Sequence, residues 1–249
     1  DIISSSDSES NSSDDDDDGD VHFESNEIKS SASKSQTNSI LYTIAIFSEY
    51  LPYELTECIH NRIFDWTLKT RIVVEVAYGL SYMHSRNLLH TRLNSTKILL
   101  NGVYEAKIID FHHNLRIGLN DFNQENCPRT QEEIVYSSPE VLRNLIPDEK
   151  ADVYSFGILL YFIFFESVPN QEVCDIIKGK PMPFRFHSKS QYKNCITLIE
   201  KCTKYDPKER PCMNEILNLM KKYDYQLAPE VDSKIINRRI KALLTPSSK

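Results

Sequence analysis

The sequence predicts a mainly α-helical α+β fold with a small β part. The segment from Trp66 to Ser85 carries apolar side chains at helical spacing. A second segment, FGILLYFIFF at 156–165, is apolar on every side, as expected for the central helix of a core. Two shorter apolar segments joined by Asn101-Gly102 contribute to the β part. A chain of 249 residues, 40% of them hydrophobic, is long enough to bury a large core.

Residues 1–39 are predicted to be disordered. They hold 11 acidic residues, two lysines and 13 serines, with almost no large apolar side chains. Such a segment cannot bury enough apolar surface to offset the entropy of ordering. Its net charge is −9 while the whole chain carries −7, so residues 40–249 are nearly neutral at about +2.

Charge and composition exclude several classes of function. Nucleic-acid binding and attraction to anionic lipid need a basic excess, which this chain lacks. The longest apolar run is half the length of a membrane-spanning helix, so no span is predicted. Six cysteines without a C-x-x-C pair argue against a zinc site and suit the reducing cytoplasm or nucleus. The first residue is not Met and no signal peptide is visible, which suggests a fragment of an intracellular protein.

The ordered part is expected to begin with a strand and a long helix. The segment SILYTIAIFSEYL at 39–51 is rich in β-branched and aromatic residues, which predicts a buried strand. The helix from Trp66 to Ser85 follows. Its apolar face consists of Leu68, Ile72, Val73, Val76, Leu80 and Met83.

The sequence KILL-NG-VYEAKII at 97–109 predicts a tight β-hairpin. Asn-Gly between apolar segments is the strongest short-range indication of a two-residue turn. Such a turn fixes the register, so Leu100 is expected opposite Val103 and Lys97 opposite Ala106.

Helices are expected to dominate the rest of the chain. Residues 111–136 are polar and lack periodicity, so a functional or mobile loop is predicted. Ser138-Pro139 opens a short helix, and Asp152 to Phe165 forms the central one. Residues 234–244, KIINRRIKALL, form either an amphipathic docking helix or a frayed extension. Two further helices are indicated by the faces Tyr192, Cys195, Ile196, Ile199, Cys202 and Met213, Ile216, Leu217, Met220.

Six segments follow one another along the chain: FSEYLP, LSYMHSRNLLHTRLNSTKILLN, KIIDFH, YSSPEVL, DEKADVYSFGILL and DPKERPCMNEIL. They resemble the hinge, catalytic loop, metal-binding DFG motif, APE segment, central helix and closing loop of a eukaryotic protein kinase. The tyrosine-kinase-like serine/threonine group is the most similar. The resemblance implies a protein-kinase-like fold with a helical C-lobe at 57–224. Only the last N-lobe strand and hinge are recognisable, at 40–56, and residues 225–249 form a C-terminal tail.

The positions that carry phosphoryl transfer in this family are changed. Against the pattern H-R-D-L-x-x-x-N, Arg92 stands where the resemblance implies the catalytic aspartate, and a guanidinium cannot accept a proton. Lys97 stands at the second metal ligand, and an ammonium has no lone pair for Mg²⁺. Asn94 replaces the loop lysine that faces the γ-phosphate. The sequence therefore predicts no intact catalytic residue.

Asp110 keeps the position of the remaining metal ligand. His112 replaces the glycine of the DFG motif, which restricts the backbone there. The predicted hairpin brings Asp110 close to Arg92 and Lys97 at its open end. An internal ion pair is therefore the structural alternative to a metal site.

For four other matched residues, the resemblance implies structural roles. Glu140 and Arg210 resemble the buried ion pair that ties the APE segment to the helical base of the family. Asp152 resembles the residue that braces the catalytic-loop backbone. His90 is expected to pack beneath that loop.

Residues 1–39 contain no Gly-rich strand-turn and no V-A-I-K lysine. Two explanations stay open. Either the N-lobe is a degenerate remnant, or the acidic segment is an insertion before the final N-lobe strand of a fragment that begins within the domain.

The implied function is that of an inactive pseudokinase, a scaffold or allosteric partner of other proteins, among them an active kinase. One alternative is a serine/threonine kinase with a non-standard site. Another is a nucleotide-binding module, in which Lys97 and Arg92 offset the phosphates and adenine lies on the hinge at Ser48, Glu49 and Leu51. No cofactor is certain, and ATP binding is expected to be either weak and independent of Mg²⁺ or absent. A third is a pure interaction protein that recruits partners through its acidic and C-terminal segments.

Overall fold

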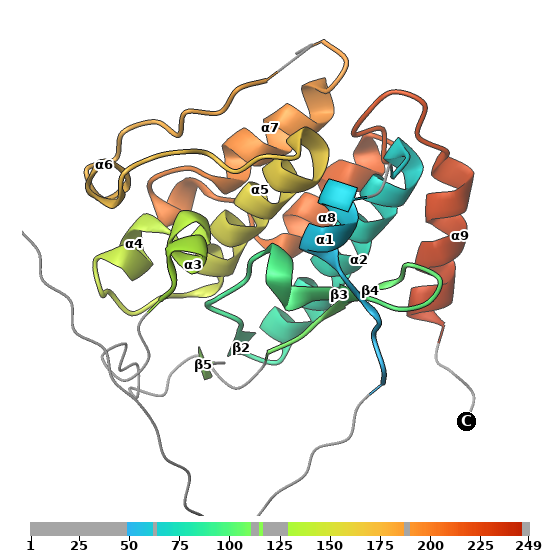
Figure 1. Ribbon diagram of the computed structural model, residues 1–249, viewed down its shortest axis with the longest axis horizontal. Helices are drawn as coiled ribbons and strands as arrows, with labels where there is room; N and C mark the ends of the chain where they lie inside the picture. Colours follow the sequence, from blue (N-terminus) through green and yellow to red (C-terminus); the bar gives the residue numbers. More distant parts are fainter. Residues whose placement is uncertain (1–48, 62–63, 111–114, 117–128, 187–189, 246–249) are drawn as a thin grey trace, which may run out of the picture. The chain divides into compact units, whose positions relative to one another are not determined.

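The computed structural model describes residues 49–61, 64–110, 115–116, 129–186 and 190–245, which lie in one unit, Ser48–Lys249. The elements are β1 (Tyr53–Glu54), α1 (Leu55–Asn61), α2 (Trp66–Ser85), β2 (Leu88–Leu89), the 3-10 helix η1 (Ser95–Lys97), β3 (Ile98–Leu100), β4 (Ala106–Ile108), β5 (Leu115–Arg116), α3 (Gln131–Tyr136), α4 (Pro139–Leu142), α5 (Glu149–Phe165), α6 (Val173–Ile177), α7 (Lys193–Cys202), the 3-10 helix η4 (Pro207–Glu209), α8 (Met213–Lys222) and α9 (Ser233–Leu244). Helices dominate, and the strands form two small sheets, so the predicted α+β class is confirmed (Figure 1).

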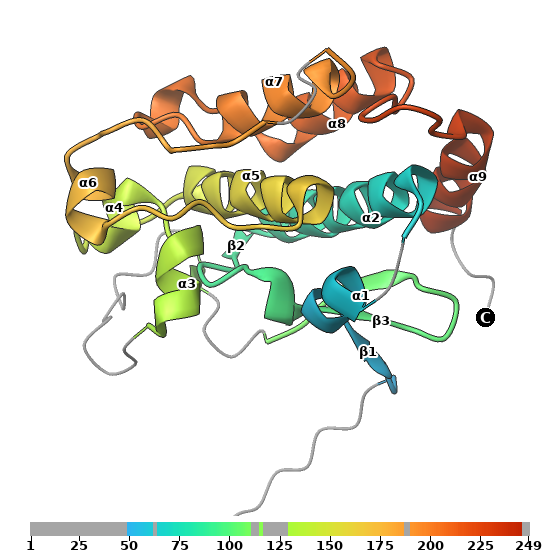
Figure 2. The same ribbon diagram turned by 45° about the horizontal axis from the view of Figure 1, so that its top comes forward.

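Helices α2 and α5 lie side by side at the centre of this unit (Figure 2). Helices α7 and α8 cover them on one side, and α1, α3 and the strands lie on the other. Every residue of α5 from Ala151 to Phe164 is buried, as its apolar sequence predicts. A Cβ on Gly157 would lie 2.7 Å from the Cβ of Cys202, so glycine is needed where α5 and α7 touch.

The helix predicted from Trp66 to Ser85 is confirmed with the same bounds. The Asp65 side chain caps its start by accepting a hydrogen bond from the N–H of Leu68 at 2.6 Å. Its predicted apolar face is buried except for Leu68, which is half-buried. Within the described ranges no helix combines the length and the apolar character that crossing a bilayer requires.

The hairpin exists, but its predicted register is wrong by three residues. Strand β3 pairs with β4, and Leu100 lies opposite Ala106 rather than Val103. The Asn101 side-chain oxygen accepts hydrogen bonds from the N–H groups of Val103 and Glu105 at 3.1 and 2.9 Å. This local bonding stabilises a longer loop over residues 101–105 instead of a two-residue turn. Lys97 consequently pairs with Ile109 rather than Ala106, through a backbone hydrogen bond of 3.0 Å.

The other element predictions have mixed outcomes. The strand expected at 39–51 falls mostly outside the described residues, whereas β1 forms at 53–54, within the segment assigned to the hinge, and pairs with β3. Residues 131–136 of the supposed loop form helix α3, and residues 111–114 and 117–128 lie outside the described part. The helices around Pro139 and over the two later apolar faces are confirmed as α4, α7 and α8.

Helix α9 packs on α2 with Ile236 and Ile240 buried, so residues 233–244 form an amphipathic helix and not a frayed end. Arg239 Nε donates to Glu75 Oε1 at 2.6 Å, and its Nη1 lies 2.6 Å from Glu105 Oε1. Burial raises the pKa of Glu75, although its hydrogen bonds and cationic neighbours oppose this. One face of the predicted docking helix is therefore occupied within the chain.

Candidate functional site

Asp152, in the first turn of α5, organises the loop of residues 90–97. Its carboxylate accepts hydrogen bonds from the backbone N–H groups of His90 and Thr91 at 2.8 and 2.7 Å. The ring Nε2 of His84 lies 3.0 Å from the same carboxylate. Burial raises the pKa of Asp152, but His84 and the donated hydrogen bonds outweigh it and hold the pKa below its ordinary 3.8. The ionised carboxylate thus ties the loop backbone to the central helix.

Two residues of the site have a left-handed backbone. Thr91 has a φ of 66° and Asp110 a φ of 71°. A β-branched residue rarely adopts this conformation, which persists only where the surroundings determine it. The N–H of Thr91 is held by Asp152, and its carbonyl accepts a hydrogen bond from Arg129 Nη1 at 2.9 Å. The loop is therefore fixed from two sides.

His90 connects the loop to the chain that follows β4. Its ring Nε2 lies 2.9 Å from the carbonyl oxygen of Ile109, and the residue is fully buried. A ring enclosed in this way has no surface for a substrate. Its contacts link two segments that both border the site.

Arg92, at the position of the missing catalytic aspartate, forms a buried ion pair. Its Nη1 lies 3.2 Å from Glu133 Oε2, and the two side chains are only 8% and 9% exposed. Glu133 also closes the capping box of α3 with Thr130, because its Oε2 accepts a hydrogen bond from the Thr130 N–H at 3.0 Å. The charge of Arg92 is thus balanced within the chain, and the pair holds α3 against the 90–97 loop.

Asn94 lies almost fully buried and caps the 3-10 helix η1. Its side-chain oxygen accepts hydrogen bonds from the N–H and hydroxyl groups of Thr96 at 2.9 and 2.7 Å, and from the N–H of Lys97 at 3.2 Å. The Asn94 amide oxygen is therefore committed to the backbone of its own loop.

Lys97 and Asp110 form the ion pair that the sequence offered as the alternative to a metal site. The Lys97 Nζ lies 2.5 Å from Asp110 Oδ2, and the side chains are 23% and 11% exposed. The observed register causes this, because Lys97 pairs with Ile109 and so lies beside the next residue, Asp110. Among the described residues, no three His, Cys, Asp or Glu side chains converge to hold a metal ion.

Two of the three residues predicted to contact adenine, Glu49 and Leu51, lie in the described part of the chain. Ser48 lies outside the described residues. Glu49 is exposed, with its Oε2 3.8 Å from Lys107 Nζ, and Leu51 is half-buried.

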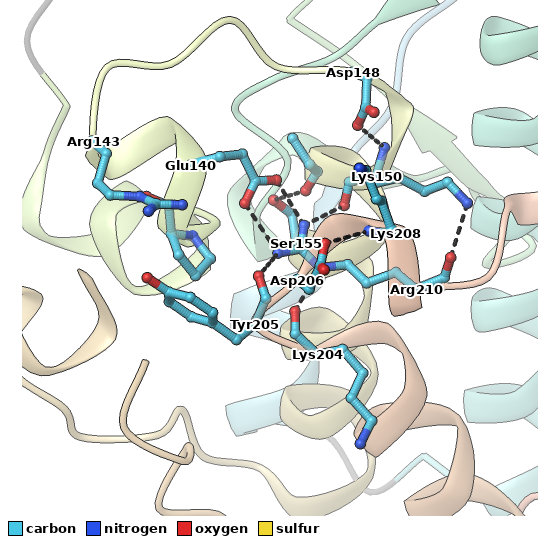
Figure 3. A network of polar contacts seen from close by, with 12 residues as sticks. Glu140, Arg143, Asp148, Lys150, Ser155, Lys204, Tyr205, Asp206, Lys208 and Arg210 are labelled. Atoms are coloured by element: carbon cyan, nitrogen blue, oxygen red, sulfur yellow. Dashed lines mark hydrogen bonds and ion pairs between the residues drawn. The ribbon is translucent and has the colours of Figure 1, made fainter. Parts of the chain in front are cut away.

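Arg210 and Glu140 form a third ion pair, which is more deeply buried (Figure 3). The Arg210 Nη1 and Nη2 donate to the Glu140 carboxylate at 2.7 and 3.0 Å. The remaining donors of Arg210 bond the carbonyl oxygens of Lys204, Tyr205 and Lys150 at 2.7 to 2.9 Å. All five guanidinium N–H groups are therefore used, and the pair joins α4, α5 and the loop before α8.

The sequence analysis missed Glu133 and helix α3. A detectable signal existed, because Thr130-Gln-Glu-Glu133 matches the capping-box pattern that opens a helix. No local pattern, however, indicates that Glu133 pairs with Arg92, 41 residues away along the chain.

Comparison with known proteins agrees with this arrangement. The family model described as "Protein tyrosine and serine/threonine kinase" matches residues 30–220. The probable serine/threonine-protein kinase drkB of Dictyostelium discoideum is 30% identical over 71% of the chain, and the probable serine/threonine-protein kinase kinX of the same organism is 28% identical over 83%. Retinal guanylyl cyclase 2 of Mus musculus is 25% identical over 64%. The chain spans only 26%, 19% and 15% of the length of these three relatives, respectively.

Proposed function

We propose that this chain, which belongs to the protein tyrosine and serine/threonine kinase family, is a pseudokinase that acts as a scaffold or allosteric partner. The observation that carries the proposal is the ion pair between Lys97 and Asp110. In this family those two positions hold the metal ions that bridge the phosphates of ATP. Here a cation occupies one position and neutralises the carboxylate at the other.

A Mg²⁺ ion does not fit these residues. Mg²⁺ needs oxygen ligands in octahedral geometry, and Lys97 supplies a positive charge 2.5 Å from the Asp110 carboxylate. The ion would first have to displace the ammonium group. No step of a metal-dependent mechanism is therefore assigned to this site.

Arg92, at the position of the catalytic aspartate, also supports an inactive site. A catalytic base must accept a proton from the substrate hydroxyl, and Arg92 remains protonated at all physiological pH values. Its guanidinium is enclosed with Glu133 and only 8% exposed. Its charge is therefore directed to Glu133 of α3.

The structural residues that the chain keeps support the scaffold role. The Glu140–Arg210 pair and the Asp152 hydrogen bonds hold the helical base and the loop in a fixed form. A rigid, kinase-shaped surface without the reactive charges is suited to protein partners, among them an active kinase. The five cysteines in the described part are free thiols, which agrees with a cytoplasmic or nuclear location.

An active serine/threonine kinase is the second candidate, because two of the relatives are named probable serine/threonine-protein kinases. Asp110 would then hold one Mg²⁺, with Lys97 replacing the other cation as the γ-phosphate moves to Ser or Thr. Positioning and electrostatics supply most of the catalysis in this reaction class, so this candidate deserves a direct test.

Thermal denaturation with ATP, with and without Mg²⁺, separates the candidates. A pseudokinase with the Lys97–Asp110 pair shows no stabilisation that requires Mg²⁺. Weak stabilisation by ATP alone identifies the metal-independent nucleotide-binding module. A large Mg²⁺-dependent rise in the melting temperature would contradict the proposal, because it requires a formed metal site.

A further inference from the structure

A basic groove lies at the end of the helical base that contains Arg210. It has a volume of about 660 Å³ and is lined by Lys150, Lys201, Lys208, Glu209, Arg210, Pro211, Glu215, Asn218, Leu219 and Lys222. These residues come from the first turn of α5, the last turn of α7, η4 with the residues after it, and α8. None belongs to the 90–97 loop.

One face of α8 forms a wall of the groove. Glu215, Asn218, Leu219 and Lys222 follow at helical spacing, whereas the opposite face of α8 buries Met213, Ile216 and Met220 in the core. The wall is therefore rigid, because the helix that presents it is anchored from behind.

The floor is rigid as well. Arg210 is 2% exposed and its five donors are all engaged, as described above. Lys150 Nζ donates to the carbonyl oxygen of Arg210 at 2.8 Å, which fixes this half-buried ammonium beside the floor. Because Glu140 balances Arg210, the positive excess of the groove is carried by its lysines against Glu209 and Glu215.

Three of those lysines have free ammonium groups. Lys201, Lys208 and Lys222 are exposed, and their ammonium groups make no ion pair or hydrogen bond within the described part of the chain. They reach the groove from three different elements. Residues 40–249 carry only about +2 in total, so three unpaired cations around one concave surface are a marked local concentration.

We propose that this groove binds a carboxylate-rich segment of a partner protein, with Lys201, Lys208 and Lys222 as its main contacts. Lysine ammonium groups act as separate point charges, which suits successive Asp or Glu side chains. The only arginine of the groove lining has no donor left, so the groove offers a phosphate group no bidentate guanidinium contact. The groove lining contains no aromatic side chain on which a nucleic-acid base would stack.

The site is independent of the proposed lack of catalysis, since it uses none of the residues that bear on phosphoryl transfer. It gives the scaffold a defined class of partner. It also predicts that partner binding weakens as salt concentration rises, because exposed charges are screened.

Fluorescence anisotropy with a labelled peptide of ten glutamates tests the site on the full chain. The triple variant Lys201→Glu, Lys208→Glu, Lys222→Glu is expected to lower the affinity by about tenfold or more, since three attractive contacts become repulsive. The matched control is Lys178→Glu, Lys193→Glu, Lys234→Glu, which changes the net charge equally at exposed lysines outside the groove. The control is expected to keep the affinity within about twofold.

A neutral variant, with glutamine at the same three groove positions, keeps the test valid if charge reversal disturbs folding. It is expected to lose about threefold or more in affinity with an unchanged melting temperature. The titration is repeated with Asp14 to Asp18 changed to Asn, which removes the acidic run of the chain itself as a competitor. Equal weakening by the groove and control variants would overturn the proposal, as would no binding of the peptide. Tighter groove-dependent binding of RNA or of anionic vesicles would overturn it in favour of another partner class.

Discussion

Two of the ion pairs described above, Glu140–Arg210 and Lys97–Asp110, differ in burial and in what they connect. Glu140 and Arg210 are joined across 70 residues, and the arginine has no unused donor. Lys97 and Asp110 are partly exposed and lie at positions where relatives in this family hold metal ions. The first pair connects α4, α5 and the loop before α8, whereas the second joins the end of η1 to the residue two positions after β4. The comparison predicts that the stability of the fold depends more on the Glu140–Arg210 pair than on the Lys97–Asp110 pair.

The largest expected effect is at the buried pair. Arg210→Ala leaves Glu140 with an uncompensated buried charge and frees three backbone carbonyls, so the free energy of unfolding should fall by about 3–5 kcal/mol. Urea denaturation measures this change in the free energy of unfolding. Lys208→Ala is the matched control, since this neighbour is exposed, and it should change stability by less than about 0.5 kcal/mol. If Arg210→Ala lowers the free energy of unfolding by less than about 1 kcal/mol, the Glu140–Arg210 pair does not stabilise the fold as claimed.

Asp152→Asn should have the next largest effect, about 2–3 kcal/mol, because an amide cannot accept all the hydrogen bonds that the carboxylate receives. The effect depends on pH. The pKa of Asp152 is lowered in the folded state, so its stabilisation is complete above the unfolded value near 3.8 and is lost as pH falls through the folded pKa. The stability difference between wild type and variant should therefore be constant above about pH 5 and narrow below it. A difference that widens in acid would reverse the assigned sign.

Lys97→Ala should cost only about 0.5–1.5 kcal/mol, because its ion pair is partly exposed and solvent screens it. The informative comparison is with Arg210→Ala, measured by the same urea titration. Equal losses at both sites would contradict the distinction between a scaffold pair and a site pair. Glu49→Ala is the control, because its contact with Lys107 is long and exposed.

The smallest effect concerns the hairpin. Gly102→Ala should change the free energy of unfolding by less than about 0.5 kcal/mol. A Cβ at this position would meet no atom within 4 Å, and Gly102 is not among the residues with positive φ. A tight Asn-Gly turn would instead require positive φ at this glycine, with a cost of about 1 kcal/mol. A loss of that size would restore the register predicted from the sequence.

Periodicity predicted the elements that the core determines. The apolar face from Ile72 to Met83 predicts α2, because those side chains can be buried together only on one side of a helix. The segment around Phe156 predicts α5, because a helix that is apolar on every side must lie inside the core. The hairpin register was not predictable from Asn-Gly alone, since the bonding of the Asn101 side chain to its own loop competes with the two-residue turn.

The residues of the site and one of its two ion pairs were predictable from the sequence. The order of the motifs identified Arg92, Lys97 and Asp110 as the residues at the positions of the catalytic loop and the DFG motif. The predicted hairpin also brought Lys97 and Asp110 close enough to form an ion pair. The partner of Arg92 was not predictable from the sequence. Glu133 reaches Arg92 only because α3 packs against the 90–97 loop, and hydrophobic periodicity does not indicate a contact of this kind. Long-range pairs of this kind depend on the assembled fold.

Transfer of labelled γ-phosphate from ATP, measured on the full chain with Mg²⁺ and a mixture of protein substrates, tests the central claim most directly. The charges of Arg92, Lys97 and Asp110 are balanced inside the chain, so incorporation should equal the background of an Asp110→Ala variant. Incorporation above that background, lost in Asp110→Ala, would contradict the account and establish an active kinase with a non-standard site.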